Sequence, residues 1–242
     1  MGTEHETFEN APIDEAVIDL HVTRGPGSAD EALQAFVDSV RAEYPSAHRR
    51  IDLSITVGPE QDLQQATAPA GWLLRSPDHP WVVLPRVEAL AVSRIRPYTS
   101  WTELEGRTRE VWTRYVELTK PERVSRIATR FINRIVLPAG EARWDEWFTT
   151  GVHLGAGLPG EIGEFLIQMS LESEGATATV VIKKETVDPL GRTPVFFDID
   201  AATVGTFAPD DPEIWSKLDV LRRFKNAIFF GSLTERTKEM FR

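Results

Sequence analysis

Residues 126–136 read RIATRFINRIV. The alternation of charged and apolar side chains in this stretch predicts which face of the surrounding sheet packs into the core. In a β-strand, successive side chains point to opposite faces of the sheet. The alternation therefore places Arg126, Arg130 and Arg134 on one face, and the opposite face is predicted to pack into the core. That second face carries Ile127, Phe131, Asn133 and Ile135. A row of guanidinium groups beside a packed face must meet water, carboxylates or a bound anion.

A second strand-like stretch carries the matching charges. Residues 196–200 read FFDID and place Asp198 and Asp200 on one face. One interpretation is a structural ladder of opposite-charge pairs between the two strands, each pair contributing roughly 0.2–1 kcal/mol. The other is a ligand-binding site, because the arginine side chains can bind phosphate or carboxylate in bidentate fashion. The sequence favours the ladder but leaves both open.

Composition limits the class of protein. The chain has 242 residues, of which 41% are hydrophobic, so an ordinary packed core in one large or two small domains is expected. Cysteine is absent, which excludes disulfides and thiolate chemistry. The net charge of −10 argues against non-specific nucleic-acid binding, which needs a basic surface. The polar, acidic N-terminus and the lack of a long apolar run predict a cytoplasmic protein without membrane contact.

The pattern along the chain predicts an α+β fold made of two βαβββα-like halves, whose antiparallel sheet or sheets are covered by helices. We expect a flexible tail over residues 1–10, a first half over 11–120 and a second half over 121–242, with the two halves forming one compact unit. In the first half, strands are expected at 14–23, 49–57, 71–75, 81–84 and 89–96, with a Pro/Gln/Ala-rich loop at 58–70. In the second half, strands are expected at 126–136, 165–172, 177–184 and 194–200.

Helix boundaries have clear signals in this chain. Ser28 and Glu31 form one S-x-x-E capping box, and Ser100 and Glu103 form another. The first predicted helix ends at Pro45, and the second ends at Lys120 and Pro121. A short helix over 144–148 crowds three bulky aromatic side chains, so it is the better candidate for an exposed partner surface. Residues 212–241 predict a long helix or a helix pair broken near Gly231.

Other chemical motifs are weak. No two of the five histidines share metal-ligand spacing, and Asp198 and Asp200 lack further ligands nearby, so neither a metal nor a cofactor is expected. The glycines of residues 155–160 match GxGxxG formally, but a strand is predicted after them where the dinucleotide fingerprint requires a helix. Asn133 is expected to bond neighbouring backbone. No catalytic residue is assigned.

Several ordered motifs resemble a sporadically distributed, functionally uncharacterised bacterial protein family of similar length. They are PIDEA at 12–16, WTEL at 101–104, RFINRI at 130–135, FDID at 197–200 and FKNAIFFGSLTE at 224–235. The resemblance spans nearly the whole chain. It implies a single-chain bacterial cytoplasmic protein, of the patchy distribution common among accessory or defence-associated genes. It implies no activity.

Two functions from different classes remain. The first is a non-enzymatic binding or regulatory protein that acts on a protein partner or on itself. The second is an anionic small-molecule-binding domain or enzyme that uses Arg126, Arg130 and Arg134. The second requires those guanidinium groups to line a pocket without carboxylates close by, whereas the ladder requires Asp198 and Asp200 within salt-bridge distance. The sequence observations favour the non-enzymatic function over an enzyme.

Overall fold

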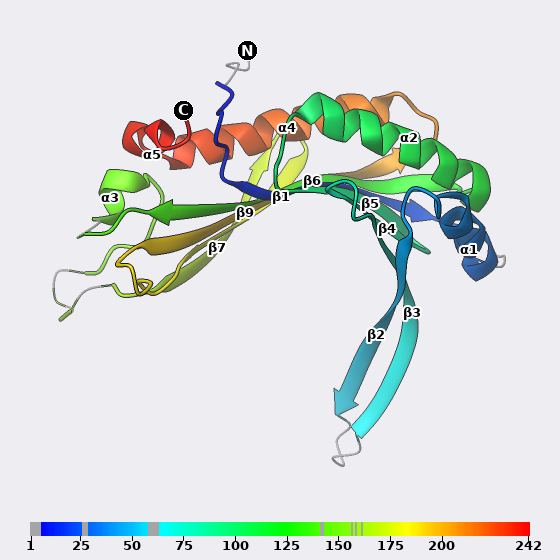
Figure 1. Ribbon diagram of the computed structural model, residues 1–242, viewed down its shortest axis with the longest axis horizontal. Helices are drawn as coiled ribbons and strands as arrows, with labels where there is room; N and C mark the ends of the chain where they lie inside the picture. The colour runs from blue at the N-terminus through cyan, green and yellow to red at the C-terminus, as the bar shows by residue number, and fades with distance from the viewer. Residues whose placement is uncertain are drawn as a thin grey trace.

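Nine antiparallel strands form a single sheet, and the two long helices of the chain lie across one of its faces (Figure 1). The computed structural model describes residues 6–25, 29–57, 63–140, 143–155, 157, 159–160 and 162–242, with the backbone alone at 29, 51–57 and 63–70. The α+β class is confirmed.

The strand order across the sheet is β2-β3-β4-β5-β1-β6-β9-β8-β7. The strands are β1 (Ile13–Thr23), β2 (Ser46–Val57), β3 (Leu63–Arg75), β4 (Trp81–Arg86), β5 (Ala89–Ile95), β6 (Arg123–Leu137), β7 (Phe165–Ser173), β8 (Ala176–Lys184) and β9 (Thr193–Phe207). At the centre, β1 pairs along its length with β6, from Ile13 opposite Asn133 to Thr23 opposite Arg123. The first and last parts of the chain therefore share one sheet.

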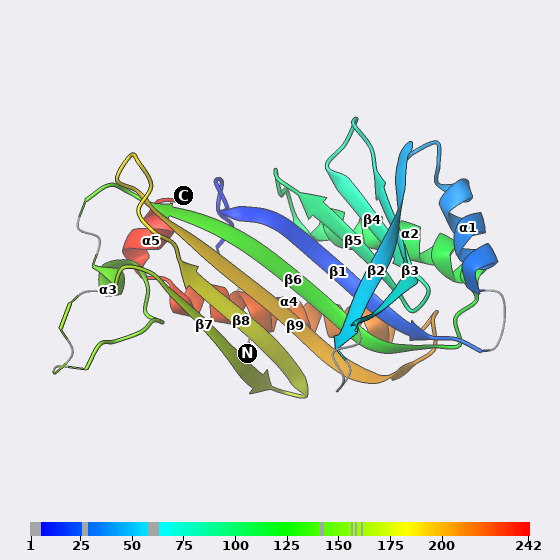
Figure 2. The same ribbon diagram turned by 90° about the horizontal axis from the view of Figure 1, so that it is seen from below.

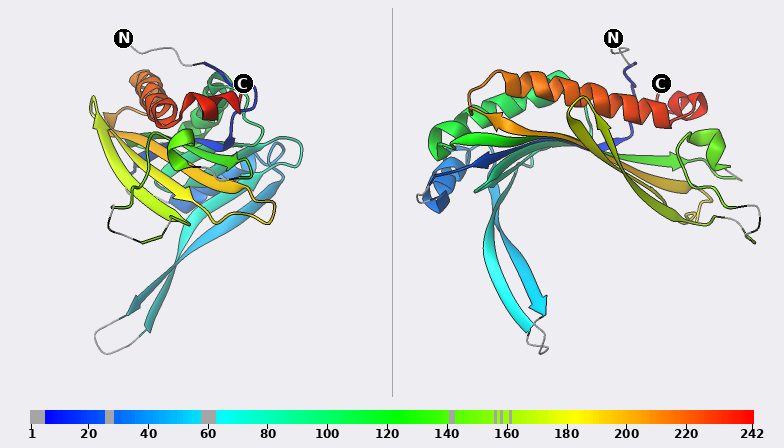
Figure 3. Two further views of the ribbon diagram at one scale, coloured as in Figure 1. Left: turned by 90° about the vertical axis from the view of Figure 1, so that its left-hand side faces the viewer. Right: turned by 180° about the vertical axis from the view of Figure 1, so that it is seen from behind.

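The helices are α1 (Ala29–Ser39), α2 (Trp101–Thr119), α3 (Trp144–Trp147), α4 (Glu213–Ser232) and α5 (Glu235–Glu239). Figure 2 shows the opposite face of the sheet, where the strands lie in front of α2 and α4. The hairpin of β2 and β3 extends away from that face (Figure 3). One face is thus packed against helices, and the other is open.

The core follows the predicted alternation. On β1 the buried side chains are Ala16, Ile18, Leu20 and Val22, and on β6 they include Ile127, Phe131 and Ile135. The start of α2 is also confirmed, because the Ser100 side chain accepts a hydrogen bond from the Glu103 N–H at 3.2 Å. The helix ends at Lys120, which adopts a left-handed conformation with φ of 46°. Residues 212–241, expected to form a long helix or a helix pair broken near Gly231, form α4 and α5, and α4 continues through Gly231 to Ser232.

The loop expected over 58–70 is wrong for residues 63–70, which belong to β3. Their low strand propensity is outweighed by continuous backbone pairing with β2. The register shifts between Arg50 and Ile51, opposite Gly71 and Pro69, and Gly71 has φ of +107°. A bulge of this kind accommodates a proline, which cannot donate a ladder hydrogen bond. Residues 58–62, and Ser28 of the first capping box, lie outside the described residues.

Two other expectations need correction. The strand expected at 194–200 continues to Phe207, where it pairs with Val124 of β6. The short helix α3 is not an exposed aromatic surface, because Trp147 and Phe148 are buried. Phe148 forms an isolated bridge with Leu233 after α4, and Trp144 stacks on the Phe148 ring at 4.2 Å. Contacts with the C-terminal helices therefore supply the burial that so short a helix lacks.

Candidate functional site

The predicted meeting of the arginine strand and the aspartate strand is confirmed. Strand β6 pairs with β9, and Arg130 lies opposite Asp200 in the register. The ion pairs run diagonally: Arg130 Nη2 lies 2.6 Å from Asp198 Oδ2, and Arg126 Nη2 lies 3.2 Å from Asp200 Oδ1. The hydrogen bond to Asp198 raises the pKa of the Arg130 guanidinium. Both arginines therefore already have carboxylate partners.

Arg134 departs from the expected pairing. Its Nη2 lies 3.2 Å from Glu185 Oε2, just beyond the end of β8, rather than near either aspartate. Glu185 also pairs with Lys183 at 3.3 Å. The row is thus a ladder of three pairs in which the third carboxylate comes from outside β9.

A hollow of about 210 Å³ does lie over the open face, with Arg126, Arg130 and Asp200 among its lining residues. Asp19 on β1 lies there too, and it accepts a hydrogen bond from Arg86 and contacts His21 at 3.1 Å. Burial alone would raise the pKa of Asp19, but the His21 hydrogen bond and the Arg86 charge leave it lowered. Positive and negative groups alternate across this hollow, so little charge is left over for a ligand.

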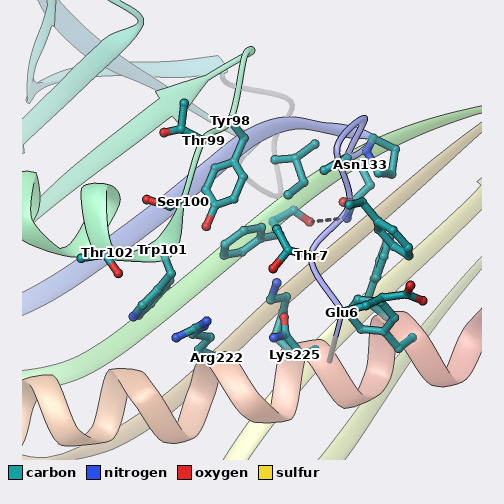
Figure 4. Close-up of a pocket in the computed structure, with 18 residues that line it drawn as sticks. Glu6, Thr7, Tyr98, Thr99, Ser100, Trp101, Thr102, Asn133, Arg222 and Lys225 are labelled. Carbon is teal, nitrogen blue, oxygen red and sulfur yellow. Dashed lines mark hydrogen bonds between the residues drawn. The ribbon is translucent and has the colours of Figure 1, made fainter. Parts of the chain in front are cut away.

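A second cavity, also of about 210 Å³, lies on the helical side of the sheet (Figure 4). Its walls come from α4, from residues 98–102 at the start of α2, from β6, and from residues 6–13. In Figure 4, Lys225 projects from α4 toward the sheet, while Tyr98 and Trp101 reach down from the other side. Four segments that are distant in sequence thus converge on one space.

Lys225 is the most unusual residue of this cavity. It is 8% exposed, and its Nζ lies 3.6 Å from the centre of the Phe131 ring. Among the described residues, it has no hydrogen-bond acceptor and no carboxylate partner. Burial lowers the pKa of Lys225 to about 7, and the positive charge of Arg222 adds to the shift. An ammonium group so placed is stabilised by the ring face but lacks a counter-ion.

Further hydrogen-bond donors surround it. Trp101 is 6% exposed, and within the described part of the chain its buried Nε1–H has no acceptor. Arg222, which is exposed, places its Cζ 5.6 Å from the Trp101 ring. Burial raises the pKa of Tyr98 to about 12, so its hydroxyl keeps its proton at neutral pH. The cavity is therefore rich in donors and in positive charge.

The nearby carboxylates are already engaged. Glu6 lines the cavity, but its Oε1 lies 2.8 Å from Arg242 Nη2. Glu103, in the first turn of α2, pairs with Arg94 at 2.7 Å. Neither compensates Lys225.

Residues 6–12, here called the N-terminal segment, form one wall of the cavity. Phe8 is buried, with its ring 5.3 Å from Phe230 and 5.5 Å from Phe241. The Asn10 N–H donates to the Phe241 carbonyl at 2.9 Å. The tail expected over 1–10 is thus anchored from residue 6 onward, because an aromatic side chain in it finds a place in the core. Residues 1–5 lie outside the described residues.

The sequence prediction located the ladder and missed the cavity. Asn133 behaves as expected, because its Nδ2 donates to the Phe197 carbonyl at 2.9 Å, and it also lines the cavity. Lys225 had a usable signal: it follows Leu218 and Leu221 on the apolar stripe of α4, where a charged residue is out of place. Trp101 and Arg222 had none, since their approach depends on how α2 and α4 pack.

Comparisons with known proteins give no assignment. Neither a scan against protein-family models nor a search of the curated proteins finds a match. In the described part of the chain, no group of three or more His, Cys, Asp or Glu side chains could hold a metal ion. Among the same residues, no helix is both long and apolar enough to cross a membrane.

Proposed function

We propose that this protein is a binding or regulatory protein that takes a small anionic ligand into the cavity around Lys225. The observation that carries the proposal is the buried amine of Lys225, whose charged form has no carboxylate partner among the described residues. Burying an unpaired charge is costly, and an anion supplied from outside would offset that cost. The proposal assigns no catalytic step.

The arginine face is a poorer place for the same ligand. A ligand that used the Nε and Nη2 donors of Arg130 would have to displace Asp198, which is 5% exposed and lies 2.6 Å from Arg130 Nη2. The displaced carboxylate would then be buried without a partner, which is strongly unfavourable. The anion-binding hypothesis therefore moves from the open face of the sheet to the helical face.

Thermal unfolding in different sodium salts tests the proposal. At constant ionic strength, acetate, benzoate or inorganic phosphate is expected to raise the Tm relative to chloride, because a ligand that binds only the folded state stabilises it. Lys225→Met should abolish the increase. Lys217→Met, on the same helix but paired with Glu213, is the matched control and should keep it. Equal Tm values in all four salts would refute the proposal.

Two finer expectations accompany this proposal. We propose that residues 11–120 and 121–242 form two related halves of the sheet. In support, β5 flanks β1 on one side of the central pair and β9 flanks β6 on the other, while α2 and α4 cover the same face. A cytoplasmic, accessory or defence-associated role in a bacterium is proposed on the sequence resemblance alone.

Self-association is a second candidate function, and the edge strand β7 favours it. Among the described strands, β7 pairs with β8 alone, and it carries no charge between Phe165 and Leu171. Sheet edges are usually protected by charges or proline. We propose that β7 of a second copy pairs with this edge.

Light scattering should detect a dimer that Leu166→Lys disrupts, whereas a monomer at high protein concentration would contradict the idea.

A further inference from the structure

We infer that the ligand of the Lys225 cavity is an amphipathic monocarboxylate: one carboxylate group held by Lys225 and the start of α2, with an apolar, preferably aromatic, body among the aromatic walls. The inference rests on the proposed function and narrows it to a chemical class.

The charge available favours a single negative charge. Lys225 is the buried cation of the cavity, whereas Arg222 is exposed at its edge. A carboxylate brings one negative charge and would be balanced by Lys225. A phosphate dianion would bring two, and the second would have to be compensated by a cation that is largely in water.

The donors available match the two oxygens of a carboxylate. Lys225 projects its N–H groups from α4 toward the cavity. Its side chain is more than nine-tenths buried. The first turn of the 19-residue helix α2 adds to these donors, since Ser100, Trp101 and Thr102 line the cavity. Backbone N–H groups at a helix N-terminus are not used within the helix and favour anions.

Part of the α2 terminus is already occupied, which limits what it can hold. The Ser100 side chain accepts from Glu103 N, and the Ser100 carbonyl accepts from Leu104 N. The first two amides of the helix remain for a ligand. Two backbone donors and one ammonium suit a carboxylate and fall short of a fully charged phosphate, whose oxygens accept more hydrogen bonds.

Part of the remaining wall is aromatic and is formed by Phe8, Tyr98, Phe131, Phe229 and Phe230. The polar residues Glu6, Thr7, Thr99, Asn133 and Asn226 also line the cavity. Tyr98 packs edge-on against Phe131 at 5.6 Å, and Phe8 lies 5.3 Å from Phe230. An inorganic ion would leave this surface against water, whereas an apolar body would cover it. A buried cation and a set of aromatic rings in the same cavity favour an amphipathic occupant.

Isothermal titration calorimetry on the full chain tests the inference with benzoate, acetate, inorganic phosphate and benzamide. Benzoate is expected to bind best. Acetate should bind more weakly because it lacks the apolar body, and benzamide because it lacks the charge. Lys225→Met should weaken benzoate binding by about 10- to 100-fold, the usual effect of losing a hydrogen bond to a charged group. Lys217→Met should leave it unchanged.

Each other outcome has a definite meaning. Tighter binding of phosphate than of benzoate would overturn the monocarboxylate inference and leave the proposed function standing. Equal binding of acetate and benzoate would overturn the apolar body. Binding of benzamide as tight as that of benzoate, or no binding of any anion, would overturn both. Circular dichroism verifies that the Lys225→Met variant is folded before its binding is compared.

Discussion

Lys225 places an amine inside the protein, so the free energy of unfolding should depend on pH. Burial, assisted by Arg222, lowers the pKa of Lys225 from 10.5 to about 7. Between these two values the unfolded chain holds a proton that the folded protein has released. The free energy of unfolding therefore rises with pH in this window, by at most about 1.4 kcal/mol per pH unit from this group.

Lys225→Met should remove this dependence and stabilise the protein. We expect the free energy of unfolding at pH 7 to increase by about 1–4 kcal/mol, since an apolar side chain replaces an uncompensated buried charge. Urea unfolding between pH 7 and 9.5 measures both effects. Of the other groups that line the cavity, the hydrogen bond from Arg242 lowers the pKa of Glu6, and Tyr98 has a pKa of about 12, so neither changes its charge in this range. Loss of stability in this variant would contradict the assigned environment.

The three arginines of β6 should differ in importance. Arg130→Ala leaves the buried Asp198 without its partner and should lower the free energy of unfolding by about 1–3 kcal/mol. Arg134→Ala should cost less than about 0.5 kcal/mol, because Arg134 and its Glu185 contact are near the surface. Urea denaturation ranks the variants.

A double variant checks the cause. Replacing Arg130 and Asp198 together by alanine removes the unpaired carboxylate, so part of the stability lost in Arg130→Ala should return. Equal losses for Arg130→Ala and Arg134→Ala would show that the burial of Asp198 is not the deciding factor.

For individual residues, the sequence predicted the ion pairs of the sheet but not the cavity. The alternation of side chains along the two strands was enough to predict that Arg126 and Arg130 pair with Asp200 and Asp198. The same alternation could not predict the partner of Arg134, because Glu185 lies beyond the end of β8. The environment of Lys225 depends on four separate segments, and no local pattern records how they converge.

Among the elements, α2 has the clearest sequence signal and a direct tie to the cavity. Ser100→Ala removes the cap on Glu103 N and should lower the free energy of unfolding by about 1 kcal/mol. Because the freed first turn is less well ordered, benzoate binding should weaken as well. Ser100→Gly is the control for the side chain, since glycine at an N-cap costs only a few tenths of a kcal/mol. Thermal unfolding and calorimetry provide the two measurements.

The predicted boundaries of helices and strands are correct where neighbouring residues determine them and wrong where distant residues do. Ser100 and Glu103 define a helix start by themselves. Residues 63–70 become a strand only because β2 runs beside them, and nothing in their own composition shows this. Phe207 likewise extends β9 by pairing with Val124 across the sheet.

Over the whole molecule, the central pairing of β1 with β6 should couple the two proposed halves. The pairing runs from Ile13 to Thr23, with register shifts near both ends. Separating the halves would break this ladder and expose core on both sides. We therefore expect one thermal transition, with calorimetric and van't Hoff enthalpies that agree. Two resolved transitions would show that the halves unfold independently.

The fold class and the covered face could be predicted, because alternation and helix signals are properties of single elements. The order of strands could not. Residues 58–70 and 71–75 appear as a loop and a short strand in the sequence, yet most of them form one long arm of a hairpin. Strand order depends on which edges meet after collapse, and apolar patterns alone do not specify it.

The near-neutral pKa of Lys225 also bears on the heat released by any anion that binds beside it. At pH 8 most of the folded protein holds this amine without its proton, whereas a bound carboxylate favours the ammonium form. Binding should then draw a proton from the buffer. The apparent enthalpy would differ between phosphate-free buffers of low and high ionisation heat, and the difference would disappear in Lys225→Met. The cavity would in that case act as a small proton reservoir that is filled when its ligand arrives.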